Sequence, residues 1–108
     1  MNRTATKTPQ ARRDLIEIAA YIAEHNEDAA YRFLDAAEQA FATLAQFPGM
    51  GVKREFANPK LANLRVWPIA KFRKYLVFYT PTRRGIRVIR VIHGARDLGR
   101  AFGRRKKG

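Results

Sequence analysis

The sequence predicts an α+β fold in which an N-terminal pair of antiparallel helices packs on a small antiparallel sheet of three or four strands. Apolar residues recur at helical spacing twice before residue 47, and three strand-like runs follow residue 63. The helices precede the strands instead of alternating with them, which is the order typical of α+β domains. With 108 residues, of which 46% are hydrophobic, the chain has the size and composition of one globular domain.

Two helices are expected in the first half of the chain. Thr8-Pro9 is a start signal, a hydroxyl N-cap followed by proline at the first helical position. Residues 25–27 interrupt the pattern, Asn26 or Asp28 can cap a second helix, and that helix stops at residues 47–49. A connection this short makes the pair an antiparallel hairpin. The apolar positions are Ala11, Leu15, Ile18, Ala19 and Ile22 in the first helix, and Phe33, Ala37, Ala40, Phe41 and Leu44 in the second.

Three strands are expected in the second half. Pro68 indicates that the first strand lies at an edge of the sheet or contains a bulge, because proline has no N–H to donate a hydrogen bond to a neighbouring strand. The second is an unbroken apolar and aromatic run, which indicates a central position. The expected elements are strands at residues 64–69, 75–79 and 86–93, a hairpin loop at 81–85, a loop at 50–63, a short helix at 97–102 and an optional short strand before Pro9.

The alternation of side chains along a strand predicts which residues reach the core. Leu76 and Phe78 lie on one side of their strand and are expected to face the helices, whereas Val77 is expected to face away. The helices would then cover one face of the sheet and leave the other partly open. The predicted core is Leu15, Ile18, Ile22, Phe33, Ala37, Phe41, Leu44, Leu76 and Phe78.

Composition excludes several functional classes. The chain has no cysteine and no serine, which excludes zinc–thiolate sites, thiol nucleophiles and a Ser-His-Asp triad. His25 and His93 have no third ligand spaced to join them, so neither a metal nor a cofactor is expected.

No apolar run approaches the roughly 20 residues of a membrane span, and no secretory signal is recognisable, so a cytoplasmic protein is expected. Residues 1–103 are expected to form one domain, followed by a basic tail at 104–108.

The charge is divided unevenly between the two halves. Residues 1–50 carry five Lys and Arg against seven acids (net −2), and residues 51–108 carry 17 against two (net +15). A block of like charge can be a merely solvated face, but it is often an interaction surface. The second half is therefore expected to attract a polyanion: nucleic acid, a protein that handles nucleic acid, or an acidic polypeptide.

The basic side chains of the strands are expected to gather on the open face of the sheet. Trp67 and Tyr75 are candidate aromatic members of this face, where they could stack on bases, although Trp67 could equally fill the core. The expected basic members are Arg65, Lys71, Arg73, Lys74, Arg87 and Arg90.

An ordered set of short motifs runs through the chain. The set is Ala11-x-x-Asp14-Leu15-x-x-Ile18-x-x-Tyr21-Ile22, Phe47-Pro48-x-Met50-Gly51, Leu64-Arg65-x-Trp67, Phe72-x-x-Tyr75-Leu76-Val77-Phe78-Tyr79 and Arg90-Val91-x-His93-Gly94-Ala95-Arg96-Asp97-Leu98. In this order and spacing the motifs resemble the ParE/RelE superfamily of type II toxins, or plasmid stabilisation proteins, and the last motif resembles the ParE branch most. The resemblance implies an αα-hairpin on a small sheet. It also implies a cognate antitoxin whose tail lies along an apolar groove beside the hairpin, and operator DNA bound only through that antitoxin.

The resemblance implies one of two activities. ParE-like members bind DNA gyrase, block resealing of cleaved DNA and need no catalytic residues. RelE-like members cleave mRNA on the ribosome with Lys and Arg side chains and a terminal Tyr or His. Here Tyr75 replaces the RelE-type arginine and Phe102 stands where the proton carrier is expected, although Arg96 matches a late RelE-type arginine. The ParE-like activity is therefore predicted, with RelE-like cleavage as the alternative and a plain nucleic-acid-binding module as a third interpretation.

Two sets of site residues follow from these alternatives. His93 can be part of a nuclease site, or it can join the last strand to its turn together with Arg96 and Asp97. The nuclease interpretation uses Glu55, Arg65, His93 and Arg96 as catalytic residues. The gyrase interpretation has no catalytic residues, and its target-binding candidates are Arg65, Trp67, Lys71, Tyr75, Arg90, His93, Arg96 and Phe102.

Overall fold

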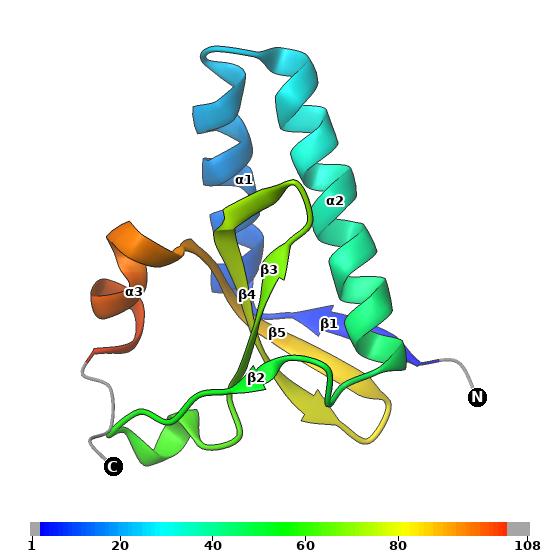
Figure 1. Ribbon diagram of the computed structural model, residues 1–108, viewed down its shortest axis with the longest axis vertical. Helices are drawn as coiled ribbons and strands as arrows, with labels where there is room; N and C mark the ends of the chain where they lie inside the picture. The colour runs from blue at the N-terminus through cyan, green and yellow to red at the C-terminus, as the bar shows by residue number, and fades with distance from the viewer. Residues whose placement is uncertain (1–2, 104–108) are drawn as a thin grey trace.

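Two long helices stand against one face of a five-stranded sheet, and a shorter C-terminal helix packs near the opposite face (Figure 1). The computed structural model describes residues 3–103, so the predicted tail at 104–108 lies outside the described residues. In chain order the elements are β1 (Thr4–Lys7), α1 (Pro9–Ala23), α2 (Glu27–Gln46), β2 (Val52–Lys53), the 3-10 helix η1 (Pro59–Leu61), β3 (Arg65–Ile69), β4 (Phe72–Thr82), β5 (Gly85–His93) and α3 (Gly94–Phe102).

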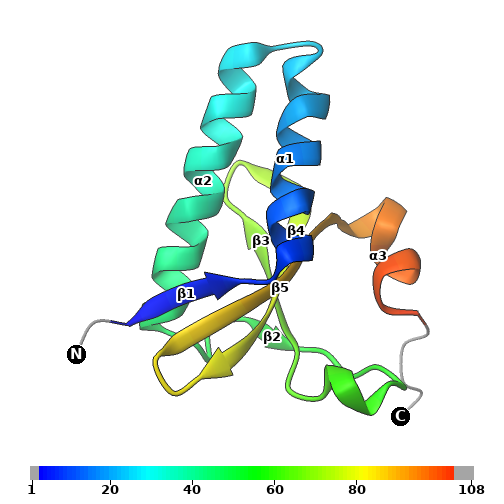
Figure 2. The ribbon, with the colours of Figure 1, turned by 180° about the vertical axis from the view of Figure 1, so that it is seen from behind.

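The sheet has the strand order β1-β5-β4-β3-β2. β1 pairs parallel with β5, and all other neighbours are antiparallel, so the sheet is mixed (Figure 2). The predicted α+β class and helical hairpin are confirmed. The sheet is larger than the three or four strands expected, because the optional N-terminal strand forms and residues 52–53 add a fifth strand beside β3.

Both long helices begin at the predicted caps. The Thr8 hydroxyl accepts a hydrogen bond from the Ala11 N–H (3.0 Å) and donates one to the Ile89 carbonyl (2.8 Å). The Asn26 side chain accepts from the Ala29 N–H (3.0 Å). Each cap satisfies an N–H group that the first turn of a helix leaves unpaired. Thr8 also ties the start of α1 to β5.

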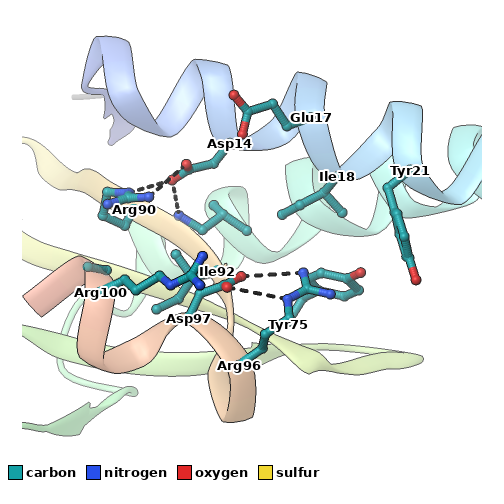
Figure 3. A pocket seen from close by; sticks show the side chains of 12 residues that line it. Asp14, Glu17, Ile18, Tyr21, Tyr75, Arg90, Ile92, Arg96, Asp97 and Arg100 are labelled. Atoms are coloured by element: carbon teal, nitrogen blue, oxygen red, sulfur yellow. Dashed lines mark hydrogen bonds and ion pairs between the residues drawn. The ribbon is translucent and has the colours of Figure 1, made fainter.

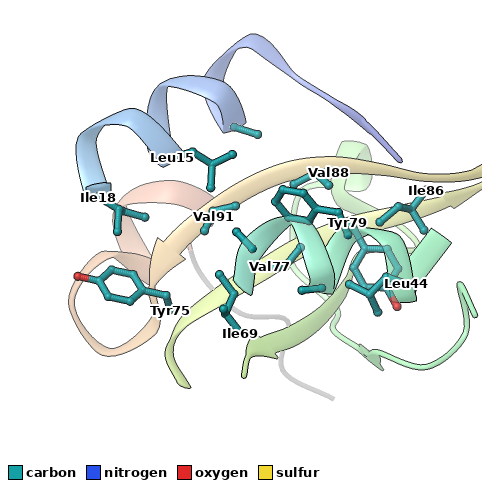
Figure 4. Close-up of a cluster of buried hydrophobic side chains, with 14 of the residues drawn as sticks. Leu15, Ile18, Leu44, Ile69, Tyr75, Val77, Tyr79, Ile86, Val88 and Val91 are labelled. Atoms are coloured by element: carbon teal, nitrogen blue, oxygen red, sulfur yellow. The ribbon is translucent and has the colours of Figure 1, made fainter. Parts of the chain in front are cut away.

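The main core lies between the helical hairpin and the sheet (Figure 4). Six of the predicted helix residues are buried in it, and Ile22 packs against it half-buried. The six are Leu15, Ile18, Phe33, Ala37, Phe41 and Leu44.

The predicted orientation of β4 was wrong. Val77 faces the helices together with Tyr75 and Tyr79, whereas Leu76 and Phe78 belong to a second apolar cluster. β4 is apolar on both sides, so alternation divides its residues into two sets without indicating which set meets the helices.

The second apolar cluster covers the face of the sheet that was expected to be partly open. Phe102 of α3 packs on Phe78, with ring centroids 4.5 Å apart, and on Phe56 at 5.2 Å. The expectation of an open basic face is therefore wrong over this part of the sheet, because α3 and the chain before β3 bury it. The members of the cluster are Phe56, Leu64, Val66, Phe78, Ile92 and Phe102.

A β-bulge interrupts β5. Tyr79 pairs with Val88, but the preceding residue Phe78 pairs with Arg90, so the pairing with β4 passes over Ile89. Val88 and Val91 consequently both reach the main core although they are three residues apart.

A buried carboxylate joins α1 to β5 just past the bulge. Asp14 is 4% exposed and accepts hydrogen bonds from Arg90 Nε (2.8 Å) and Nη2 (3.0 Å), from the Val91 backbone N–H (3.0 Å) and from Gln10 Nε2 (3.0 Å). Burial of a carboxylate is favourable only when its oxygens are paired in this way. The interaction sets the position of α1 along the sheet.

Asp14→Asn is expected to lower the free energy of unfolding by about 1–3 kcal/mol. An amide has one acceptor oxygen in place of two, and its NH₂ group would face the Arg90 or Val91 donor. Urea denaturation measures the effect. Glu17→Gln, an exposed change on the same helix, is the control and should stay within about 0.5 kcal/mol of the unmodified protein. Equal effects of the two substitutions would contradict the assigned role of Asp14.

Candidate functional site

A polar cleft lies between α1, the end of β5 and α3 (Figure 3). Its volume is about 430 Å³. The cleft brings together three of the predicted target-binding residues, Tyr75, Arg90 and Arg96. Among the polar residues that line it, five were not predicted as site residues: Asp14, Glu17, Tyr21, Asp97 and Arg100. Asp14 could have been found, because it is an acid three residues after Ala11 and four before Ile18, within the apolar stripe of the helix.

Two of the cleft's arginines are neutralised by carboxylates of the same chain. Arg90 binds Asp14, and Arg96 contacts Asp97 through Nε and Nη2, both at 3.3 Å. The Arg96 guanidinium also lies over the Tyr21 ring, 5.8 Å from its centroid. The hydrogen bond between Arg96 and Asp97 raises the pKa of Arg96 and lowers the pKa of Asp97. Arg96 thus sits at the rim of the cleft, with its side chain about half exposed.

His93 forms the cap of α3. Its Nδ1 accepts a hydrogen bond from the Arg96 N–H (3.2 Å), and its ring meets Tyr75 edge-on, with centroids 5.5 Å apart. The His93 backbone N–H also helps to lower the pKa of the Asp97 carboxylate. The cap gives His93 a structural role at the junction of β5 and α3.

The four residues of the nuclease interpretation do not converge. Glu55, Arg65 and Arg96 each line a different cavity. Arg65 donates to the carbonyls of Gly51 (2.7 Å) and Gly49 (3.3 Å) and so holds the turn after α2.

Tyr79 holds the same turn from the sheet. Its hydroxyl donates to the Pro48 carbonyl (2.7 Å) and accepts from the Gly51 N–H (2.8 Å). Burial raises the pKa of Tyr79. A Cβ at Gly51 would lie 2.5 Å from this hydroxyl, so the close approach requires glycine. Arg65 and Tyr79 therefore serve the fold at this turn.

A second hollow, the α2 groove, lies between α2 and the β3–β4 turn. Its volume is about 850 Å³, and it contains the predicted residues Trp67 and Lys71. Trp67 is half-buried and packs against the main core, and Met50 and Phe72 add to the apolar floor. Charged side chains stand among its walls: Arg32, Asp35 and Lys71.

The remaining predicted residue, Phe102, is not on the surface. It is 7% exposed and fills the second cluster, so the expectation that it forms part of an exposed binding surface is corrected.

Among residues 3–103 no three His, Asp or Glu side chains gather in a way that could hold a metal ion. Within the same residues no helix is both long and apolar enough to cross a membrane.

One family model matches most of the chain. Residues 6–98 match the family described as the ParE toxin of the type II toxin–antitoxin system parDE. A solved chain described as the chromosomal ParDE TA system from P. aeruginosa superposes with a TM-score of 0.65, at 16% sequence identity, over 84% of this chain and 95% of that one. At this identity the likeness shows the fold. No curated protein matches the chain at a significant level.

The Arg96–Asp97 pair predicts a pH dependence of stability. Because the pKa of Asp97 is lowered in the folded state, its ionised form stabilises the fold; the contribution is complete above about pH 4 and is lost as the pH falls through the folded-state pKa. Asp97→Asn should therefore lower the free energy of unfolding near neutral pH, by less than about 1 kcal/mol since the pair is partly exposed to solvent. The difference should disappear in acid. Urea denaturation at several pH values measures it, and a difference independent of pH would contradict the role of the carboxylate.

Proposed function

The chain belongs to the family of ParE toxins of type II toxin–antitoxin systems, and on this premise we propose that it stops growth by binding DNA gyrase and blocking the resealing of cleaved DNA. A toxin domain of residues 1–103 would act through its surfaces, without catalytic residues. One observation carries this choice: Arg90 and Arg96, the cleft arginines predicted from the sequence, are each paired with a carboxylate of the same chain. Guanidinium groups held in this way shape a surface but are not free to stabilise charge on a reacting phosphate.

The mRNA endoribonuclease alternative has less support. Tyr75, at the position of the RelE-type arginine, is buried and packs edge-on against the rings of Phe33 and His93. Phe102, at the position of the proton carrier, is also buried. His93 uses Nδ1 for the cap of α3. A phosphate site that lacks both an arginine and a proton carrier would be slower by roughly a hundredfold or more.

The rim of the cleft is the proposed target-binding surface. Arg96 and Arg100 of α3 and Tyr21 of α1 are exposed there, and Arg96 stacks over Tyr21. Arginine and tyrosine dominate the strongly contributing positions of many protein interfaces, because both combine a large contact area with directed polar groups. The pairing of Arg96 with Asp97 and Tyr21 in the free protein holds the side chain near one geometry, which reduces the entropy lost on binding.

The α2 groove is the proposed docking site of the antitoxin tail. Its floor of Met50, Trp67 and Phe72 would receive the apolar residues of the tail. Lys71 lies at the edge of the groove, and residues 51–108, to which it belongs, have a net charge of +15. This positive charge favours acidic residues in the tail. An amphipathic, acidic segment that orders on binding fits this surface.

The gyrase assignment predicts a clear division between two assays. Full-length protein given supercoiled DNA, gyrase and ATP should accumulate cleaved or unresealed DNA. The same protein given mRNA on translating ribosomes should leave the mRNA uncut. In the gyrase assay Arg96→Ala should raise the concentration for half-maximal effect about tenfold, as expected for an interface arginine. Arg12→Ala, an exposed change of equal charge that is not among the cleft's lining residues, should have little effect.

His93→Ala separates the structural role of His93 from a catalytic one. It should lower stability by about 1 kcal/mol, the value of a typical hydrogen bond, and leave the folded protein active against gyrase. Cleavage of mRNA at defined codon positions that vanishes in His93→Ala would overturn the gyrase proposal and support the nuclease alternative.

The groove assignment predicts a local charge effect on antitoxin binding. Lys71→Glu should weaken the affinity for the antitoxin encoded beside the toxin by about tenfold or more, because an acidic tail would then meet a like charge. Lys74→Glu is the matched control, since Lys74 is also exposed and does not line the groove. Isothermal titration calorimetry measures both affinities. Equal reductions would show general charge attraction instead of docking in the groove.

A further inference from the structure

The turn of the β4–β5 hairpin presents two adjacent arginines. Thr82 pairs with Gly85, so the loop consists of Arg83 and Arg84 alone, and both side chains are exposed. The turn lies at the end of the molecule opposite the α1–α2 connection, where β1 runs beside β5 up to the turn (Figures 1 and 2).

Two further arginines stand at the same end. Arg87 is exposed on β5, in register with Thr6 on one side and Thr80 on the other. Arg3 is exposed and directly precedes Thr4, whose N–H donates to the Arg84 carbonyl (2.7 Å). These four residues are called the hairpin cluster: Arg3, Arg83, Arg84 and Arg87.

The hairpin cluster has no counter-charge among the residues that the structure describes. The ion pairs within residues 3–103 involve Lys7, Arg90 and Arg96, and none involves a member of the cluster. No acidic residue occurs between Glu55 and Asp97 in the sequence. Four exposed arginines at one end of the molecule without an ion-pair partner give that end a positive potential, which attracts a polyanion. The cluster differs in this respect from the arginines of the cleft.

The backbone that carries the cluster is held firmly. β1 lies against the turn, and a Cβ at Gly85, where φ is +142°, would collide with the Thr4 carbonyl oxygen. The Arg84 N–H also donates to the Thr82 hydroxyl (3.3 Å). The arginines therefore project from a hairpin whose backbone is held in place, so little backbone entropy would be lost when a ligand binds them.

We propose that the hairpin cluster binds the phosphate backbone of duplex DNA. Duplex DNA carries one negative charge per roughly 1.7 Å of its axis, so arginines at the tip and side of the hairpin would meet several phosphates at once. Residues 80–87 contain no aromatic side chain, so the hairpin lacks the stacking platforms that single strands require. The proposal rests on the cluster alone and does not depend on the gyrase proposal.

The test uses the full-length chain and a fluorescently labelled duplex of about 20 base pairs of random sequence, followed by anisotropy at increasing salt. Binding should weaken steeply with salt, because each phosphate that an arginine neutralises releases a counterion. The double variant Arg83→Ala/Arg84→Ala should bind about tenfold or more weakly at moderate salt. Its slope of log affinity against log salt should fall by about two, close to one for each arginine removed.

A matched control separates a local surface from net charge. Arg12→Ala/Arg13→Ala removes an adjacent pair of exposed arginines from α1 and should change affinity and slope much less. Arg83→Gln/Arg84→Gln repeats the test with polar side chains, and thermal melting should show both hairpin variants folded. Unmodified protein that does not bind the duplex would overturn the proposal, as would equal reductions in affinity for the helix and hairpin variants. Equal affinity for a single strand of the same length would overturn the choice of a duplex as the ligand.

Discussion

The buried carboxylate of Asp14 is the constraint on which the arrangement of the other elements depends. It lies in an apolar layer, where an unpaired charge would be strongly destabilising, and its partners are Arg90 and the Val91 N–H of β5. Only one position of α1 along the sheet brings these groups together. Thr8 adds a second tie to the same strand, through the carbonyls of Val88 and Ile89 at the bulge. The cleft follows from this arrangement, because α3 leaves the end of β5 beside the helix that Asp14 holds in place.

Apolar clusters on both faces of the sheet confine recognition to its margins. The helical hairpin covers one face, and α3 with the chain before β3 covers much of the other. The three surfaces proposed for partners lie at these margins: the cleft beside α3, the α2 groove and the tip of the β4–β5 hairpin. Since they lie on different margins, a partner in the groove need not occupy the cleft or the hairpin tip. A small domain can in this way combine several binding surfaces with a core large enough to hold it folded.

The environment of each arginine indicates what it can do. Arg90 and Arg96 have carboxylate partners, so they contribute geometry and a fixed hydrogen-bonding surface. Arg65 is engaged by two backbone carbonyls and stabilises a turn. The arginines of the hairpin cluster have no acidic partner among the described residues, which leaves their charge available to a polyanion. The strong positive charge of the second half is thus the sum of groups with different physical roles.

The sequence alone determined the α+β class, the helical hairpin with its two caps, the helix residues of the core and the resemblance to the toxin family. These features depend on local signals: helical spacing of apolar residues, cap side chains and ordered short motifs.

Only the tertiary structure decided which side of β4 faces the helices, because a strand that is apolar on both sides carries no information about which side meets them. It also decided the bulge at Ile89, the burial of Phe102 and the separation of Glu55, Arg65 and Arg96. Such contacts between distant segments arise only when the whole chain packs, and for this reason the partner of each arginine could not be read from its neighbours in sequence.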